Sequence, residues 1–187
     1  MSILVTYASK HGATRQIAQR IGEKLRAAGL DAEVRPIRAA DDVRGYDAVV
    51  IGSAVYFESW LKEATNFVRR HETVLARLPV WLFSSGPLGT AATDAQGRDL
   101  RQVAEPKDIT ELKRAIQPRD HHVFFGALDH HQFGLTERLL WALPAARQLL
   151  MEGDFRNWAD VEAWAERIAR ELVPVAASDA KASEVIR

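Results

Sequence analysis

The chain contains no cysteine among its 187 residues. This absence excludes a disulfide framework, a thiolate metal site, an iron–sulfur cluster held by cysteines and a thiol redox couple. Any redox chemistry must therefore be carried by a bound cofactor. No apolar run approaches the length of a membrane span, and the first one is too short for a signal peptide. These features predict a cytoplasmic protein.

The chain also lacks an excess of charge of either sign. Lysine and arginine total 25, and aspartate and glutamate total 25. A nucleic-acid-binding surface usually needs basic excess, so no nucleic-acid partner is predicted. A strongly acidic electron carrier that is steered to basic partners by its field is likewise disfavoured.

What the sequence does contain is a polar turn directly after its first apolar strand, Ile3–Tyr7. The turn has too few glycines for a dinucleotide fingerprint and lacks the Gly-Lys-Ser/Thr ending of a nucleoside triphosphatase loop. A helix N-terminus with hydroxyl side chains and a flexible glycine suits a single terminal phosphate. The alternative is an ordinary helix cap. The phosphate-binding candidates are Ser9, Lys10, His11, Gly12, Ala13 and Thr14.

Strand and helix patterns alternate along the chain. Strands are predicted at Ile3–Tyr7, Asp31–Ile37, Tyr46–Ile51, Pro79–Phe83 and His122–Leu128, and helices at Ala13–Ala28, Leu61–His71, Ile109–Ile116 and Trp158–Leu172. This order predicts an α/β fold, a doubly wound five-stranded parallel sheet with helices on both faces. We expect one domain over residues 1–173 with an insert at 129–156, followed by a flexible tail at 174–187.

In such a sheet, ligands bind beyond the carboxyl ends of the strands, where the strand order reverses. Three turns should converge there: Ser9–Thr14, Ser53–Trp60 and Ser84–Thr90. Their spacing suits a planar ring held by the second and third turns, with its phosphate on the first. The ring-binding candidates are Ser53, Ala54, Val55, Tyr56, Trp60, Ser84, Ser85, Gly86, Pro87, Leu88 and Gly89.

Three aromatic residues of the second turn are candidates for stacking on that ring. Tyr56 is the strongest, followed by Phe57 and Trp60. The alternative is that Phe57 and Trp60 pack against the following helix. The third turn has no aromatic residue, which would leave one face of the ring open to a substrate.

Together these segments resemble the flavodoxin family. Ser9–Thr14 is similar to its phosphate loop for FMN, and Ile51–Tyr56 and Ser84–Pro87 are similar to its two ring-binding loops. Within the family, the stretches Gly52–Trp60 and Phe125–Leu128 resemble the menaquinone-dependent protoporphyrinogen oxidase group most. Glu58 stands where relatives often have glycine.

The resemblance implies a flavodoxin-like fold and FMN as the cofactor. It implies an FMN-dependent oxidoreductase that oxidises protoporphyrinogen IX in haem biosynthesis and passes electrons to a quinone. The alternatives are an electron-transfer protein with protein partners and a non-catalytic binding module. Because the flavin carries the chemistry, no catalytic side chain is predicted. Since Ser53–Glu58 contains no glycine that would allow a peptide flip, we expect modest semiquinone stabilisation.

Two other features have several interpretations. The pairs His121-His122 and His130-His131 fit strand-edge or loop positions better than a metal site, because adjacent strand residues point to opposite faces. The apolar insert at 129–156 fits a helix packed on the core, a lid, a dimer contact, or a surface for a quinone or the inner face of the membrane.

Overall fold

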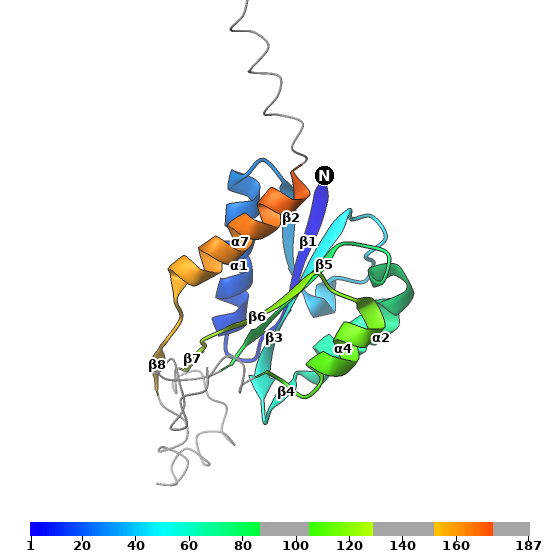
Figure 1. Cartoon of the computed structure of the whole chain (residues 1–187). Helices are drawn as coiled ribbons and strands as arrows, with labels where there is room; N and C mark the ends of the chain where they lie inside the picture. Colours follow the sequence, from blue (N-terminus) through cyan, green and yellow to red (C-terminus); the bar gives the residue numbers. More distant parts are fainter. Residues whose placement is uncertain (87–104, 129–151, 174–187) are drawn as a thin grey trace, which may run out of the picture.

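The computed structural model describes residues 1–86, 105–128 and 152–173. Within them, five parallel strands lie in the spatial order β2-β1-β3-β5-β6 (Figure 1). In that order they span Asp31–Pro36, Ser2–Ala8, Ala48–Tyr56, Val80–Ser85 and Asp120–Phe124. The chain moves outward from β1 to β2, returns to β3 and then continues in the opposite direction. The switch point of this doubly wound sheet lies at the ends of β1 and β3.

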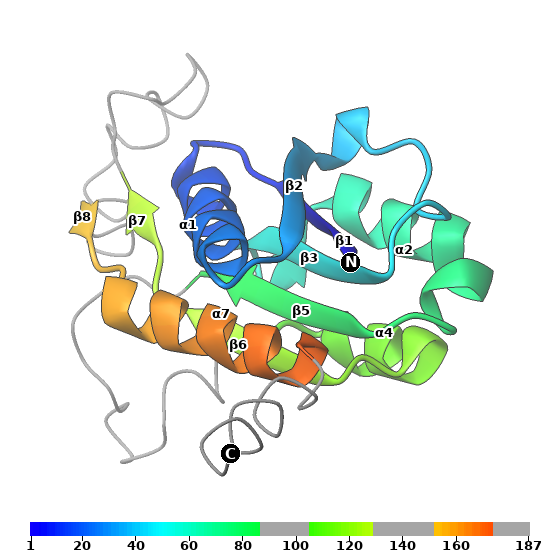
Figure 2. The same cartoon turned by 90° about the horizontal axis from the view of Figure 1, so that it is seen from above.

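Helices cover both faces of the sheet (Figure 2). α1 (Ala13–Ala27) and α7 (Trp158–Leu172) pack on one face, and α2 (Lys62–Leu75) and α4 (Ile109–Ile116) on the other. The central strands β1, β3 and β5 are therefore nearly continuous buried apolar runs, as expected of parallel strands covered on both sides. This part of the fold confirms the architecture expected from the sequence.

Charged side chains join α1 to α7 above their apolar contact. Lys24 lies 3.1 Å from Glu162 and 3.0 Å from Glu166. At the start of α7, the side chain of Asn157 accepts a hydrogen bond from the backbone N–H of Asp160, at 3.2 Å. The ion pairs hold α7 beside α1, whose N-terminus faces the switch point, and the cap fixes the first turn of α7.

Short elements complete the described part. β4 (Ser59–Trp60) folds back antiparallel on the end of β3, and η1 (Ile37–Ala39) follows β2. β7 (Ala127–Leu128) pairs with β8 (Gly153–Asp154) in a separate two-stranded sheet. The β7–β8 pair brings together the two segments that precede and follow residues 129–151.

The fifth strand differs from its prediction. It ends at Phe124, and β7 leaves the main sheet to pair with β8. Gly126 marks the break, and its carbonyl accepts a hydrogen bond from the backbone N–H of Phe155 at 3.1 Å. β3 is longer than predicted, because its polar end, Ser53, stays paired with Ser84 of β5. The body of the insert at 129–151 and the tail at 174–187 lie outside the described residues.

No helix in the described part of the chain combines the length and the apolar character that crossing a bilayer requires.

Candidate functional site

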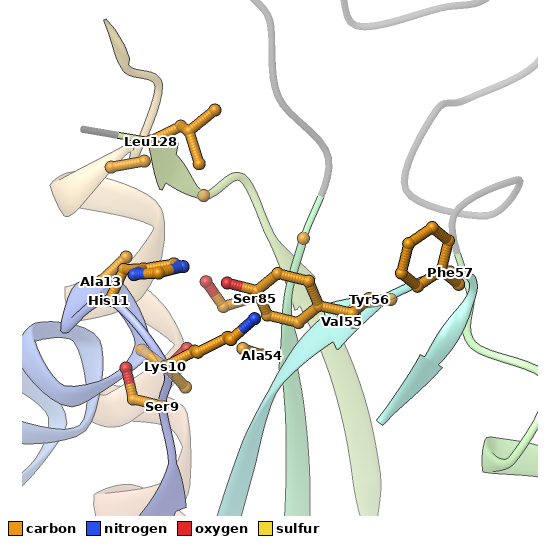
Figure 3. A pocket seen from close by; sticks show the side chains of 14 residues that line it. Ser9, Lys10, His11, Ala13, Ala54, Val55, Tyr56, Phe57, Ser85 and Leu128 are labelled. Atoms are coloured by element: carbon orange, nitrogen blue, oxygen red, sulfur yellow. The ribbon is translucent and has the colours of Figure 1, made fainter. Parts of the chain in front are cut away.

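A pocket of about 370 Å³ opens where β1, β3 and β5 end (Figure 3). Three segments far apart in the sequence meet there: the turn after β1, the end of β3 and the end of β5. The pocket-lining residues that the sequence predicted are Ser9, Lys10, His11, Ala13, Thr14, Ala54, Val55, Tyr56, Ser85 and Gly86. The predicted Pro87, Leu88 and Gly89 lie outside the described residues.

The turn after β1 has the conformation of an anion-binding loop. Gly12 precedes α1 with φ 83°, in the left-handed region that glycine adopts without strain. Its N–H donates to the Ser9 hydroxyl oxygen at 3.0 Å, which closes the turn. The first turn of the described helix α1 has no capping side chain and no acidic residue. Its N–H groups and the buried Thr14 can therefore serve a phosphate at the positive end of the helix dipole.

The Tyr56 side chain borders the pocket and leans toward this turn (Figure 3). The Lys10 ammonium lies 5.2 Å from the centre of the Tyr56 ring, and the His11 ring packs edge-on at 6.3 Å. The turn after β1 and the end of β3 are thus in direct contact. A flat ligand in the pocket would meet the Tyr56 ring at one side.

The described residues that line the pocket include no carboxylate, whereas Lys10 and His11 lie at its edge. The local charge therefore favours anionic or neutral ligands. The end of β5 closes the pocket tightly: a Cβ added to Gly86 would lie 3.1 Å from Val55, so little room remains between these segments.

Sequence reasoning missed the contribution of residues 126–128, whereas Phe57 was among its stacking candidates. Gly126, Ala127, Leu128 and Phe57 all line the pocket. A glycine within a strand pattern is a known signal of a break, and Gly126 carried that signal. An adjoining pocket of about 360 Å³ contains Gly12 and extends from the phosphate loop to β8.

Three residues predicted to contact the ring lie below the pocket. The Ser53 hydroxyl donates to the Ala54 carbonyl at 2.9 Å and accepts from the Leu61 N–H at 3.1 Å. Ser84 and Trp60 are buried, and the Trp60 indole N–H donates to the Ser84 hydroxyl oxygen at 2.8 Å. They line neither described pocket. Their hydrogen bonds to one another and to the backbone make them supports of the site.

This buried contact is part of a longer chain of hydrogen bonds. The Ser84 hydroxyl lies 2.8 Å from Nε2 of His121, whose Nδ1 lies 3.2 Å from Glu105. Because an indole only donates, Ser84 must accept from Trp60 and has its own hydrogen free for His121. Glu105 accepts at the far end, so His121 is neutral with its proton on Nδ1. Each side chain in this series of hydrogen bonds then has a partner.

The electrostatics agree with a neutral His121, whose side chain is only 2% exposed. Burial lowers its pKa to about 4, and the charge of Lys113 acts in the same direction. Burial acts to raise the pKa of Glu105, but its ion pair with Lys113 outweighs this, and the pKa of Glu105 is lowered. The Ser84–His121–Glu105 order resembles that of a serine nucleophile, yet Ser84 is sealed from both pockets. The arrangement positions other groups and is not a hydrolytic site.

The neighbouring histidines point to opposite faces of the edge strand β6, as expected for adjacent strand residues. His121 faces Ser84, whereas His122 lies 3.1 Å from Asp160 of α7 and packs beside Trp164. Among the described residues, no three histidine, aspartate or glutamate side chains are grouped as a metal site would need. His130 and His131 lie outside these residues.

Comparison with known proteins shows which family the sequence matches. A profile described as a flavodoxin domain matches residues 4–146. The structure also resembles a cysteine-to-serine mutant of flavodoxin from Pseudomonas aeruginosa, with a TM-score of 0.57, 15% identity and coverage of 92% of this chain and 99% of that one. It resembles oxidised flavodoxin 1 from Bacillus cereus with a TM-score of 0.55, 10% identity and coverage of 92% and 100%. These likenesses confirm the flavodoxin-like fold.

Among curated proteins, the chain is similar to the protoporphyrinogen IX dehydrogenase (quinone) of Escherichia coli K12. The two are 28% identical over 86 residues. The match covers 45% of this chain and 48% of the relative, which is about half the length of each.

Proposed function

This chain belongs to the flavodoxin family, whose cofactor is FMN, and on that premise we propose that the pocket holds FMN for an oxidoreductase reaction. The observation that carries the proposal is the convergence of three loops at the switch point of the sheet, around a pocket of about 370 Å³. In the proposed arrangement, the turn Ser9–Thr14 binds the phosphate and Tyr56 borders the isoalloxazine ring. Bound FMN would supply the redox chemistry by accepting and releasing electrons.

The residues of this chain would bind and orient the cofactor. Thr14 and the N–H groups at the start of α1 would neutralise the phosphate, and Gly12 would keep the backbone close to it. The tight packing of Gly86 against Val55 would hold the ends of β3 and β5 together beside the ring. The hydrogen bonds that run from Trp60 to Glu105 would hold the end of β3 in place.

The likeness to protoporphyrinogen IX dehydrogenase supports a porphyrinogen substrate and a quinone acceptor. The absence of carboxylates from the described pocket lining also suits a neutral or anionic small molecule. Anaerobic turnover of protoporphyrinogen with a quinone analogue tests this assignment. Oxidation no faster than the uncatalysed rate would remove it and favour the second candidate, an electron-transfer protein with protein partners.

Cofactor binding has its own test, the visible absorption spectrum of the purified protein. We expect the flavin spectrum and quenching of FMN fluorescence on titration of apoprotein. A colourless protein that takes up no added FMN would leave only the third alternative, a non-catalytic binding module.

Thr14→Val should weaken FMN binding by about 10-fold or more, because a hydrogen bond to a charged group is lost. The substitution keeps the shape of the buried side chain, so folding should change little. Fluorescence titration of apoprotein measures the dissociation constant. Thr73→Val, on the exposed face of α2, is the matched control. Equal affinity in the two variants would argue against a phosphate at Thr14.

Stepwise anaerobic reduction should produce only a small fraction of neutral semiquinone. No glycine lies between Ser53 and Glu58, and the Glu58 carbonyl is held by the Lys107 N–H at 2.9 Å. A peptide rotation here on reduction would break this bond. Absorption spectra recorded during the titration give the semiquinone yield, and a high yield would contradict the prediction.

A further inference from the structure

Phe57 is the most exposed large apolar side chain of the described residues. It is 94% exposed, compared with 50% for Met1 and 39% for Val173, both near ends of the described ranges. Exposure of a single apolar side chain is ordinary by itself. Phe57 differs because it stands at the edge of the proposed cofactor pocket and because its backbone is strained.

The strain lies in the two-residue turn between β3 and β4. Tyr56 pairs with Ser59, so Phe57 and Glu58 are the central residues of the hairpin, with φ values of 50° and 61°. Such turns normally use Asn-Gly or similar residues, because left-handed φ values are unfavourable for other side chains. Non-glycine residues in this region are unfavourable and persist where the surroundings impose them.

Four contacts impose this conformation, and all of them avoid the Phe57 ring. The Lys107 N–H donates to the Glu58 carbonyl, and the Lys107 ammonium pairs with the Glu58 carboxylate. The Trp60 N–H donates to Asp108 at 2.8 Å, and the Trp60 indole is anchored on Ser84. These contacts thus hold an unfavourable backbone conformation. That conformation projects the Phe57 ring away from the core.

The direction of the ring indicates what it contacts. Figure 3 shows Tyr56 leaning toward the phosphate loop, whereas Phe57 stands apart at the outer end of the strand. Tyr56 would already border FMN. The exposed Phe57 ring would therefore face a second molecule that approaches the mouth of the pocket. Aromatic rings stack on flat conjugated systems, and no carboxylate of the described lining would repel a neutral or anionic one.

We propose that Phe57 is a specificity-determining contact for the small-molecule redox partner, which presents a flat conjugated ring to it. The inference rests on the proposed function. A quinone presents such a ring directly, and a porphyrinogen presents it as pyrrole rings joined by saturated bridges, so separate reactions are needed to distinguish them.

The test uses the full FMN-loaded protein and Phe57→Ala. In one reaction, the reduced protein is mixed anaerobically with menadione, and flavin reoxidation is followed by stopped-flow absorbance. In the other, the oxidised protein is mixed with protoporphyrinogen. We expect the second-order rate constant of at least one reaction to fall about 3- to 10-fold, the loss of one stacking contact. The reaction affected identifies the partner.

Four controls separate this role from others. Ferricyanide, which has no flat ring, should reoxidise the reduced protein at an unchanged rate. Phe57→Trp should retain the rates with the flat partners, and Val173→Ala should change none. FMN affinity should remain within about 2-fold in Phe57→Ala, since 2-fold is well below the effect of a lost contact.

The proposal is overturned if Phe57→Ala leaves both reactions unchanged, slows ferricyanide equally, or weakens FMN binding substantially. The last result would make Phe57 part of the cofactor site. Failure of the proposed function has a different signature, because the wild-type protein would then bind no FMN or react with neither flat partner.

Discussion

Gly52→Ala is expected to destabilise the protein by on the order of 3 kcal/mol, at the upper end of overpacking effects. A Cβ at this position would lie only 1.9 Å from Cζ of Phe83 and 2.2 Å from its Cε1. Phe83 has little freedom to move, because its ring is fully buried against Phe124 and Trp164. The added methyl group must displace either the ring cluster or the two central strands.

Thermal unfolding and urea titration measure this loss, with an expected fall in melting temperature of roughly 6–12 °C. Gly45→Ala is the matched control, since its added Cβ meets nothing within 4 Å. Phe83→Leu should rescue part of the loss in the double variant, because the smaller side chain frees the space. If Gly52→Ala and Gly45→Ala are equally stable, the close packing of β3 on Phe83 is wrong.

Acidification from pH 6.5 to 4 is expected to remove on the order of 3 kcal/mol of stability through His121. The pKa of His121 is about 4 in the folded protein, compared with 6.5 for an unperturbed histidine. As pH falls below 6.5, the unfolded chain therefore takes up a proton before the folded chain does. The stabilising effect is complete above pH 6.5, declines through this window and reaches its limit near pH 4.

The physical cause is the direction of the buried hydrogen bonds. A second proton on His121 would place an N–H against the Ser84 oxygen, which already accepts from Trp60. The charged groups facing the ring are Glu105, Lys113 and Asp120. The two carboxylates favour protonation, but burial and Lys113 outweigh them.

Urea unfolding of the wild type and His121→Gln at several pH values isolates the effect. The stability difference between them should shrink as pH falls from 7 to 4. The pKa of His71 is also lowered by burial, but His71 is present in both proteins and cancels. Lys113→Gln should raise the pKa of His121 and so narrow the pH range over which stability is lost. Parallel stability curves for wild type and His121→Gln would disprove the assigned protonation state.

The fold was largely predictable because its information is local. The buried strands and amphipathic helices have clear hydrophobic patterns, and the helices Ile109–Ile116 and Trp158–Leu172 match their predicted bounds. The turn after β1 was equally predictable, since a strand, a polar turn with Gly12 and a helix are consecutive in the sequence.

The support of the site was not predictable, because it depends on contacts between distant segments. Trp60 follows the pocket loop and was therefore expected on the ring, yet its indole turns inward to Ser84. The partner that completes this bond, His121, is 37 residues beyond Ser84 in the sequence. No local sequence pattern predicts the contact between Ser84 and His121.

The backbone conformation of the turn at Phe57 and Glu58 was likewise not predictable from the local sequence. Local preference disfavours left-handed φ values at both residues, and the contacts from Lys107 and Asp108 override it. The one sequence signal was the glycine that relatives often have at the position of Glu58.

The pairing of β7 with β8 has a consequence for how such proteins diversify. Leu128 lies opposite Gly153, and Ala127 opposite Asp154, so β7 and β8 form a narrow base at which both ends of the stretch between them lie side by side. Both strands of that base border the pockets beside the phosphate loop. Residues 129–151 could therefore be exchanged, lengthened or shortened as a cassette while the main sheet keeps its register.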